Sequence, residues 1–229
     1  MIEHKFVCHL DIESNKHRWT KFDDSYTPWT ASKTKTLIKD ISEKDDKRMV
    51  SFWNLPREKH LAKCGITLQQ YKLYHHIVQN KLNNVLVLED DALRVSTEPI
   101  NYPDDCVTYL GGYFQHNKLM NTKRIDVDSV EGFNECLSQA DGGQFCIMMT
   151  MSYIIPKWEI AEELILHLDS LKRWRSIDIM LWKSPVKKGY MYPASYVEEE
   201  IPSTLRNKRK KTNIYYQIIN WGKDHLVKY

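Results

Sequence analysis

Short apolar runs alternate with longer segments of helical periodicity along much of the chain. Residues 5–10 and 85–88 are mostly apolar runs of strand length, and the second contains only valine and leucine, which is typical of a strand buried on both faces. Between them, apolar residues recur every three or four positions over 65–81, which predicts an amphipathic helix. Strands that alternate with helices in this way predict an α/β protein with a mostly parallel central sheet flanked by helices.

The second half of the chain continues this alternation. A short strand ending in glycine is expected at 106–111, and one or two more at 144–155. Pro156 is expected to open a helix because its restricted φ suits the first helical turn, and a further short helix is expected at 177–182. One additional strand is expected earlier, at 49–53. Ligands bind at the carboxyl ends of strands in such sheets, so the residues that directly follow the strands are candidates for a site.

Three consecutive acidic residues, Glu89, Asp90 and Asp91, follow the buried run at 85–88. Side chains alternate along an extended chain, so Glu89 and Asp91 are expected on one side and Asp90 on the other. Two converging carboxylates repel each other, and a divalent cation relieves that repulsion. The pattern therefore favours Mn²⁺ or Mg²⁺ bound to Glu89 and Asp91, where it would stabilise a departing phosphate or diphosphate. The alternative is a solvated acidic loop.

Composition limits the classes of protein that this chain can belong to. Its 229 residues are 42% hydrophobic and 28% charged, which excludes a disordered tail and a coiled coil. No apolar run approaches the roughly 20 residues of a membrane span, and the cysteines form no Cys-x-x-Cys pair, so we expect a soluble cytoplasmic protein with free thiols. The net charge of +3 argues against nucleic acid as a partner. The basic run 206–211 is interpreted as a solvated segment, with a loop over a bound diphosphate as the alternative.

The order of short motifs along the chain resembles glycosyltransferase family 25, which contains the lipooligosaccharide β-galactosyltransferases and the collagen galactosyltransferases. The motifs that carry the resemblance are Val7–Asp11, Gly65–Tyr74, Leu86–Ala92, Thr108–Gly111, Thr150–Ile155 and Ser176–Asp178. Three departures bear on the choice of donor and acceptor. Gln69 and Gln70 stand where the family has serine and histidine, Met149 stands where it has glycine, and Ser176 where it has proline.

The resemblance implies a GT-A fold that transfers a sugar with inversion from a nucleotide-sugar donor, with UDP as the expected nucleotide and Mn²⁺ as the expected cofactor. The acceptor would be a glycan hydroxyl, and a viral member would act in the host cytoplasm. The roles that it implies are metal binding for Glu89 and Asp91, and donor binding for Leu10, Asp11, Arg18 and Asp90.

Asp178 is our candidate for the catalytic base. An inverting transfer needs a group that takes the proton of the acceptor hydroxyl, and a carboxylate opposite the leaving group is the usual solution. Asp178 lies near a predicted helix start, so the alternative is a carboxylate that only complements the helix dipole. Trp174 and Trp182 flank it and are expected to form a platform for the acceptor, to which Gln144 would contribute from a loop.

We expect one glycosyltransferase domain over 1–229. Its donor-binding part would span about 1–112 and its acceptor-binding part about 113–205, followed by a basic segment at 206–229. Two other interpretations stay open: a metal-dependent phosphotransferase or nucleotidyltransferase, and a non-catalytic glycan- or RNA-binding module. A phosphotransferase is disfavoured because the sequence has no glycine-rich phosphate loop.

Overall fold

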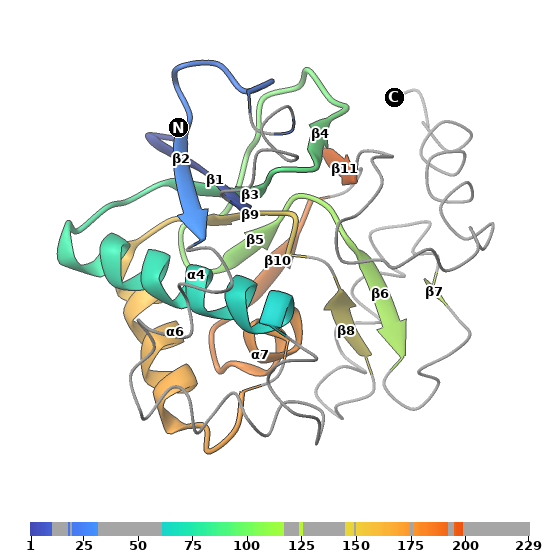
Figure 1. Ribbon diagram of the computed structural model, residues 1–229. Helices are drawn as coiled ribbons and strands as arrows, with labels where there is room; N and C mark the ends of the chain where they lie inside the picture. The colour runs from blue at the N-terminus through green and yellow to red at the C-terminus, as the bar shows by residue number, and fades with distance from the viewer. Residues whose placement is uncertain are drawn as a thin grey trace.

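A six-stranded sheet forms the centre of the protein (Figure 1). The computed structural model describes residues 1–10, 18, 20–31, 61–116, 124–125, 145–148, 150–174, 176–191 and 195–198. The strands of the central sheet, in spatial order, are β10 (Lys188–Tyr190), β5 (Val107–Tyr109), β9 (Ser152–Ile155), β3 (Val85–Glu89), β1 (His4–Leu10) and β2 (Thr27–Ala31).

The central sheet is mostly parallel, as the alternation of strands and helices predicts. β2, β1 and β3 pair in parallel, as do β5 and β10, whereas β9 runs antiparallel between β3 and β5. The five parallel strands therefore all end at one edge of the sheet, where β9 begins. We call this the carboxyl edge, and it is the place where an α/β sheet presents its ligand site.

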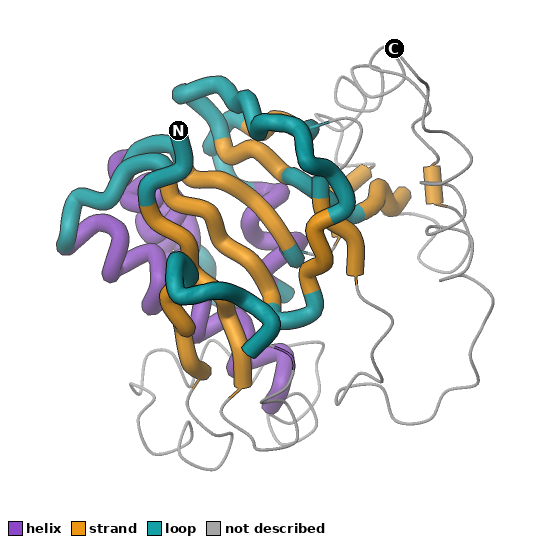
Figure 2. The backbone as a smooth tube through the Cα atoms, turned by 90° about the horizontal axis from the view of Figure 1, so that it is seen from above, coloured by secondary structure: helices purple, strands orange, loops and turns teal. Residues whose placement is uncertain are grey.

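Within the described residues, three helices cover one face of this sheet, and loops with a small ribbon cover the other (Figures 1 and 2). The helices are α4 (Leu61–Gln79), α6 (Trp158–Ser170) and α7 (Ile177–Lys183). The ribbon on the other face pairs β4 (Ala92–Arg94) with β11 (Tyr196–Glu198) in antiparallel fashion. A separate antiparallel sheet joins β7 (Arg124–Ile125), β6 (Tyr113–His116) and β8 (Phe145–Met148).

Alternate residues of the buried strands divide the core into two layers. Val85 and Val87 belong to the larger cluster under the helices, whereas Leu86 and Leu88 belong to the smaller cluster under the ribbon. Every one of these four side chains is at most 1% exposed. The run of valine and leucine is therefore buried on both faces, as the sequence predicts.

The helix predicted at 65–81 spans Leu61–Gln79 and ends without a glycine. Lys81 takes a left-handed φ of 51°, while Leu82 N donates to Ile77 O at 3.0 Å and Lys81 N donates to Val78 O at 3.1 Å. These two bonds form a Schellman motif, which satisfies the last carbonyls of the helix.

Other predicted elements are found at the expected places. The predicted strand at 106–111 is β5, the segment 144–155 contains β8 and β9, and the helix at 177–182 is α7. The strand expected at 49–53 lies outside the described residues.

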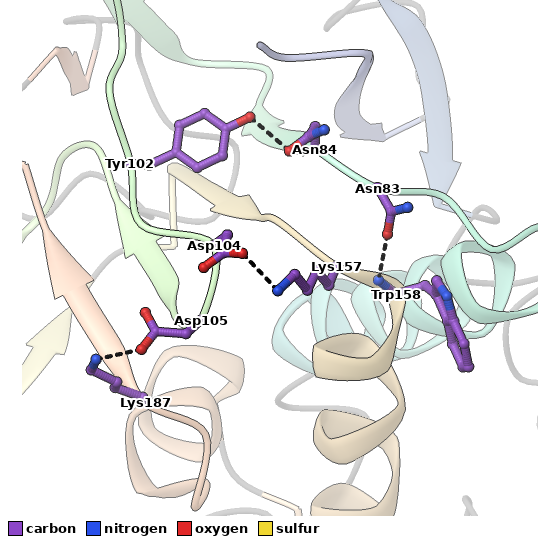
Figure 3. Close-up of polar contacts among 8 residues, drawn as sticks. All are labelled: Asn83, Asn84, Tyr102, Asp104, Asp105, Lys157, Trp158 and Lys187. Carbon is purple, nitrogen blue, oxygen red and sulfur yellow. Dashed lines mark hydrogen bonds and ion pairs between the residues drawn. The ribbon is translucent and has the colours of Figure 1, made fainter.

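The helix after Pro156 is α6, and Asn83 serves as its cap from another segment. Asn83 Oδ1 accepts a hydrogen bond from Trp158 N at 3.2 Å (Figure 3), which satisfies one of the free amides at the helix start. Two exposed ion pairs lie on the same side, Lys157 with Asp104 at 2.7 Å and Lys187 with Asp105 at 2.6 Å. All of these residues stand next to the amino ends of parallel strands, so this edge is opposite to the carboxyl edge.

Gly111 lies just after β5, where two segments approach closely. A Cβ at this position would collide with the carbonyl oxygen of Tyr196, because Ser195 N and Tyr196 N, at the start of β11, donate to Leu110 O at 2.8 and 3.0 Å. Any larger residue would push the ribbon away from the carboxyl edge.

Within the described part of the chain, no helix is long and apolar enough to cross a membrane.

Candidate functional site

The three acidic residues at the end of β3 and just after it lie at the carboxyl edge, between β1 and the start of β9. Glu89 is the last residue of β3 and stands opposite Cys8 of β1. Its backbone N donates to Met151 O at 2.8 Å, and Thr150 Oγ1 donates to Glu89 Oε1 at 3.1 Å. The strand pairing itself therefore positions the Glu89 carboxylate beside the segment that leads into β9.

Arg18 binds the other two carboxylates of the group. Its guanidinium lies 3.0 Å from Asp91 Oδ2 and 3.4 Å from Asp90 Oδ1, and the side chains of Arg18, Asp90 and Asp91 are only 7%, 11% and 16% exposed. Hydrogen bonds between ionised groups are strong when they are shielded from water in this way. The remaining oxygen, Asp91 Oδ1, is buried and finds no hydrogen-bond partner among the described residues.

The predicted alternation of these side chains is wrong at Asp90. β3 ends at Glu89, and Asp90 and Asp91 form the turn that leads into β4. Alternation holds only for extended backbone, so the turn allows both aspartates to face the same guanidinium. Asp90 is consequently part of the charged cluster rather than directed away from it.

The pKa of Glu89 is raised, first because its carboxyl group is buried and second because other carboxylates lie within electrostatic range. Burial and the charge of Asp91 raise the pKa of Glu89 to about 8, with further contributions from Asp178 and Asp90, while the hydrogen bond from Thr150 opposes the rise. A carboxylate that is half-buried among other carboxylates holds its proton because ionisation would add repulsion and cost desolvation. We name Glu89, Asp90, Asp91 and Asp178 the carboxylate cluster.

Asp178 joins this cluster from a distant part of the sequence. It lies in the first turn of α7, where Asp178 Oδ1 accepts a hydrogen bond from Ile179 N at 3.0 Å. It therefore interacts with the helix start, as the alternative interpretation of this residue expects. Its charge nevertheless acts on Glu89, so the fold brings the start of α7 close to the end of β3.

The substitution Glu89→Gln is expected to stabilise the folded protein, relative to the natural chain, increasingly as pH rises from about 5 to about 8. The folded state holds the Glu89 proton up to a pKa of about 8, whereas the unfolded chain releases it near 4.5. The unfolded state binds fewer protons in this window, so the free energy of unfolding of the natural chain falls with rising pH. The contribution of the Glu89 proton to the free energy of unfolding is therefore complete below pH 4.5, and it is lost as the pH rises past about 8.

Urea unfolding at several pH values across this window measures the effect. The matched control is Glu163→Gln, which removes an exposed glutamate from α6 and should leave the slope with pH unchanged. Parallel stability curves for Glu89→Gln and the natural chain would show that Glu89 ionises normally.

The thiol beside Glu89 is inert, as expected for a structural cysteine. Cys8 is buried, and burial together with the charges of Glu89 and Asp90 raises its pKa well above the usual range. The thiolate, which is the reactive form, is therefore not populated near neutral pH. Cys8 and Cys106 are both buried free thiols, which confirms that prediction for these two residues.

Gln69, whose role could not be predicted from the sequence, links β1 to β2 through side-chain and backbone hydrogen bonds. Gln69 Nε2 donates to His9 O at 3.1 Å and also to Trp29 O, and Trp29 Nε1 donates to Gln69 O at 3.0 Å. These bonds reach the two strands from α4, at the next-to-last residue of β1 and the middle residue of β2. The available signal was a pair of glutamines within an otherwise apolar helix face, since buried amides require partners.

Gln70, the second of the pair, bonds to two tyrosines in the core. Gln70 Oε1 accepts hydrogen bonds from Tyr74 OH, at 3.2 Å, and from Tyr153 OH. The two hydroxyls are also 3.0 Å apart, and all three residues are fully buried. This network joins α4 to β9 beneath the carboxylate cluster.

The prediction of an aromatic acceptor platform is wrong. Trp174 is completely buried, and its Nε1 donates to Leu168 O at 3.0 Å. Trp182 is 8% exposed and belongs to the same core cluster. A ring that stacks on a sugar must present a face to solvent, whereas these rings fill the space between the helices and the sheet. The two tryptophans flank Asp178 in the sequence, but this position does not determine the direction in which their rings point.

The remaining predicted site residues are placed in part or not at all. Leu10 is the last residue of β1, opposite Ala31 of β2, so its backbone lies at the carboxyl edge. Asp11, Gln144 and the basic run 206–211 lie outside the described residues. Within the part of the chain that the structure describes, no group of three or more histidine, cysteine, aspartate or glutamate side chains has the arrangement of a metal site.

No family model matches the sequence, and no curated protein matches it either.

Proposed function

We propose that the protein is a metal-dependent, inverting glycosyltransferase of GT-A architecture, which transfers a sugar from a nucleoside-diphosphate donor to a hydroxyl of a glycan. The observation that carries this proposal is the carboxylate cluster. Three consecutive carboxylates and Asp178 of α7 gather at the carboxyl edge of a mostly parallel sheet, where one buried guanidinium pairs with Asp90 and Asp91. Such an excess of buried negative charge is costly unless a cation compensates it.

The cluster suits a hard divalent cation such as Mn²⁺ or Mg²⁺. Asp91 Oδ1 is buried without a hydrogen-bond partner among the described residues, and burial together with the charge of Asp91 raises the pKa of Glu89. Glu89 and Asp91 would hold the ion, since one or two carboxylates suffice when substrate phosphates complete the coordination. When bound, the ion would neutralise charge on the departing diphosphate.

Different residues of the cluster would then bind the donor and take the proton of the acceptor. Glu89 and Asp91 orient the donor diphosphate through the cation, and Thr150 fixes Glu89 by its hydrogen bond to Oε1. Asp178 is the proposed base, because its carboxylate lies close enough to the cluster to act on Glu89 and stands on a different element. It would take the proton of the acceptor hydroxyl as the new glycosidic bond forms.

The experiment that tests this function is a thermal unfolding screen with UDP, GDP and CDP and their common sugars, each with and without Mn²⁺. A ligand that binds only the folded state stabilises it by about 2.7 kcal/mol at 100 times its Kd. We expect one nucleotide family, with UDP the first candidate, to raise the Tm only when Mn²⁺ is present. A chelator should reverse the shift.

Two outcomes would contradict the proposal. If none of the nucleotides shifts the Tm, the assignment of a nucleotide-sugar donor fails. If a nucleotide shifts the Tm equally with and without Mn²⁺, the cation has no part in donor binding. A positive result also has to lead to product, so the donor that binds is then incubated with glycan acceptors, and a transferred sugar is sought by mass spectrometry.

A further inference from the structure

We infer that Arg18 is a built-in counter-ion that competes with the divalent cation for Asp91, and so sets the affinity of the cluster for metal. This inference deepens the proposed function, since it rests on the metal site proposed above. Its distinguishing claim is that a positively charged residue of the site weakens metal binding when it is present, and that its removal strengthens binding.

The geometry of Arg18 is that of a substitute cation. Its side chain is 7% exposed, and the ion pairs to Asp91 and Asp90, at 3.0 and 3.4 Å, hold the guanidinium inside the protein. Arg18 Nε is buried and finds no hydrogen-bond partner among the described residues. Among the described residues, the contacts of this side chain are therefore those to the two carboxylates.

The same carboxylates are those proposed to bind the metal. Asp91 offers Oδ2 to Arg18, and only Oδ1 is left without a partner among the described residues. A divalent ion ligated by Asp91 would lie a few ångströms from the guanidinium, as ligand distances of roughly 2.0–2.2 Å require. Two cations at that separation in a poorly solvated site repel each other strongly.

Competition of this kind has a thermodynamic consequence. In the absence of metal, Arg18 compensates part of the negative charge and lowers the free energy of the metal-free state. A metal ion must displace that interaction or bear the repulsion, and either effect weakens its binding. Loss of Arg18 should therefore increase metal affinity by about ten-fold. This factor lies toward the lower end of the range by which one bound group typically changes the affinity for another.

The experiment measures Mn²⁺ binding to the full-length chain without nucleotide, by the loss of the free Mn²⁺ signal in electron paramagnetic resonance. Arg18→Met removes the charge and keeps most of the length of the side chain. We expect its Kd for Mn²⁺ to be about ten-fold lower than that of the natural chain. The matched control is Arg94→Met, because Arg94 is exposed and donates to the backbone carbonyls of Ser96 and Glu98.

Arg18→Lys tests whether the charge or the packing of Arg18 is responsible for the change in Mn²⁺ affinity. It also replaces Arg18→Met in the experiment if that variant does not fold. An ammonium retains the charge but cannot bridge two carboxylates as a guanidinium does. Its Mn²⁺ Kd should therefore lie between those of the natural chain and Arg18→Met, or below that of the natural chain if Arg18→Met cannot be measured.

The outcomes separate this inference from the proposed function. If the natural chain binds Mn²⁺ and neither Arg18 variant binds it more tightly, the competition is refuted while the metal site stands. If neither the natural chain nor any variant binds Mn²⁺, the metal site itself is refuted, and the inference fails with it. Tighter binding in both Arg94→Met and Arg18→Met would also refute the inference, because it would indicate a general effect of net charge.

Discussion

Replacing Asp91 with asparagine is expected to lower kcat for sugar transfer by about 100- to 1,000-fold, the loss typical of removing one preorganised charge-stabilising group. The amide keeps the shape of the side chain but removes one of the two carboxylates proposed to hold the cation. It also breaks the 3.0 Å ion pair with Arg18. Initial rates are measured with the donor that the nucleotide screen selects, at saturating Mn²⁺.

Asp104→Asn is the matched control for this substitution. Asp104 also forms an ion pair, with Lys157 at 2.7 Å, but both side chains are largely exposed at the opposite edge of the sheet (Figure 3). Exposed pairs contribute little to stability, so this variant should keep the kcat of the natural chain. An Asp91→Asn variant that is as active as Asp104→Asn would remove Asp91 from the catalytic site.

Replacing Trp174 with alanine is expected to lower the free energy of unfolding by about 3–5 kcal/mol, the usual cost of truncating a buried aromatic residue. Trp174 is completely buried between the helices and the sheet, and the variant would also lose the hydrogen bond from Nε1 to Leu168 O. The loss is a large part of the 5–15 kcal/mol by which a typical domain is stable. Urea unfolding followed by circular dichroism measures it.

Trp174→Phe separates a core role from an acceptor role. It retains most of the ring volume but removes the indole N–H, so it should cost less than the alanine variant and leave the KM for acceptor unchanged. A variant with unaltered stability and a raised KM for acceptor would restore the aromatic platform that the sequence suggests, and would require Trp174 to leave the core.

Local patterns in the sequence were sufficient for the elements that depend on neighbouring residues. The run of valine and leucine at 85–88 is buried on both faces because both faces of the central sheet are covered. The spacing of apolar residues over 65–81 gave a helix, although its end depends on the left-handed Lys81. A lysine is not a recognisable stop signal, since glycine usually takes that position.

The carboxylate cluster could be predicted only in part. The position of Glu89 after a buried strand follows from the sequence, because strand ends meet at one edge of a parallel sheet. The orientation of Asp90 does not, since it depends on whether the chain stays extended, and the chain turns at that point. Gln69 was missed because its partners, His9 and Trp29, lie on two strands far from it in the sequence.

The sequence by itself determined the class of the fold and the edge at which its acidic residues gather, because hydrophobic periodicity and strand order follow from residues near one another in the chain. Only the tertiary structure decided which groups meet there. Arg18 reaches Asp91 across 73 positions, and α7 brings Asp178 within electrostatic reach of Glu89. The packing of the helices on the sheet also places Trp174 in the core and not on the surface. Contacts of this kind depend on how the helices settle on the sheet, and no local pattern encodes that arrangement.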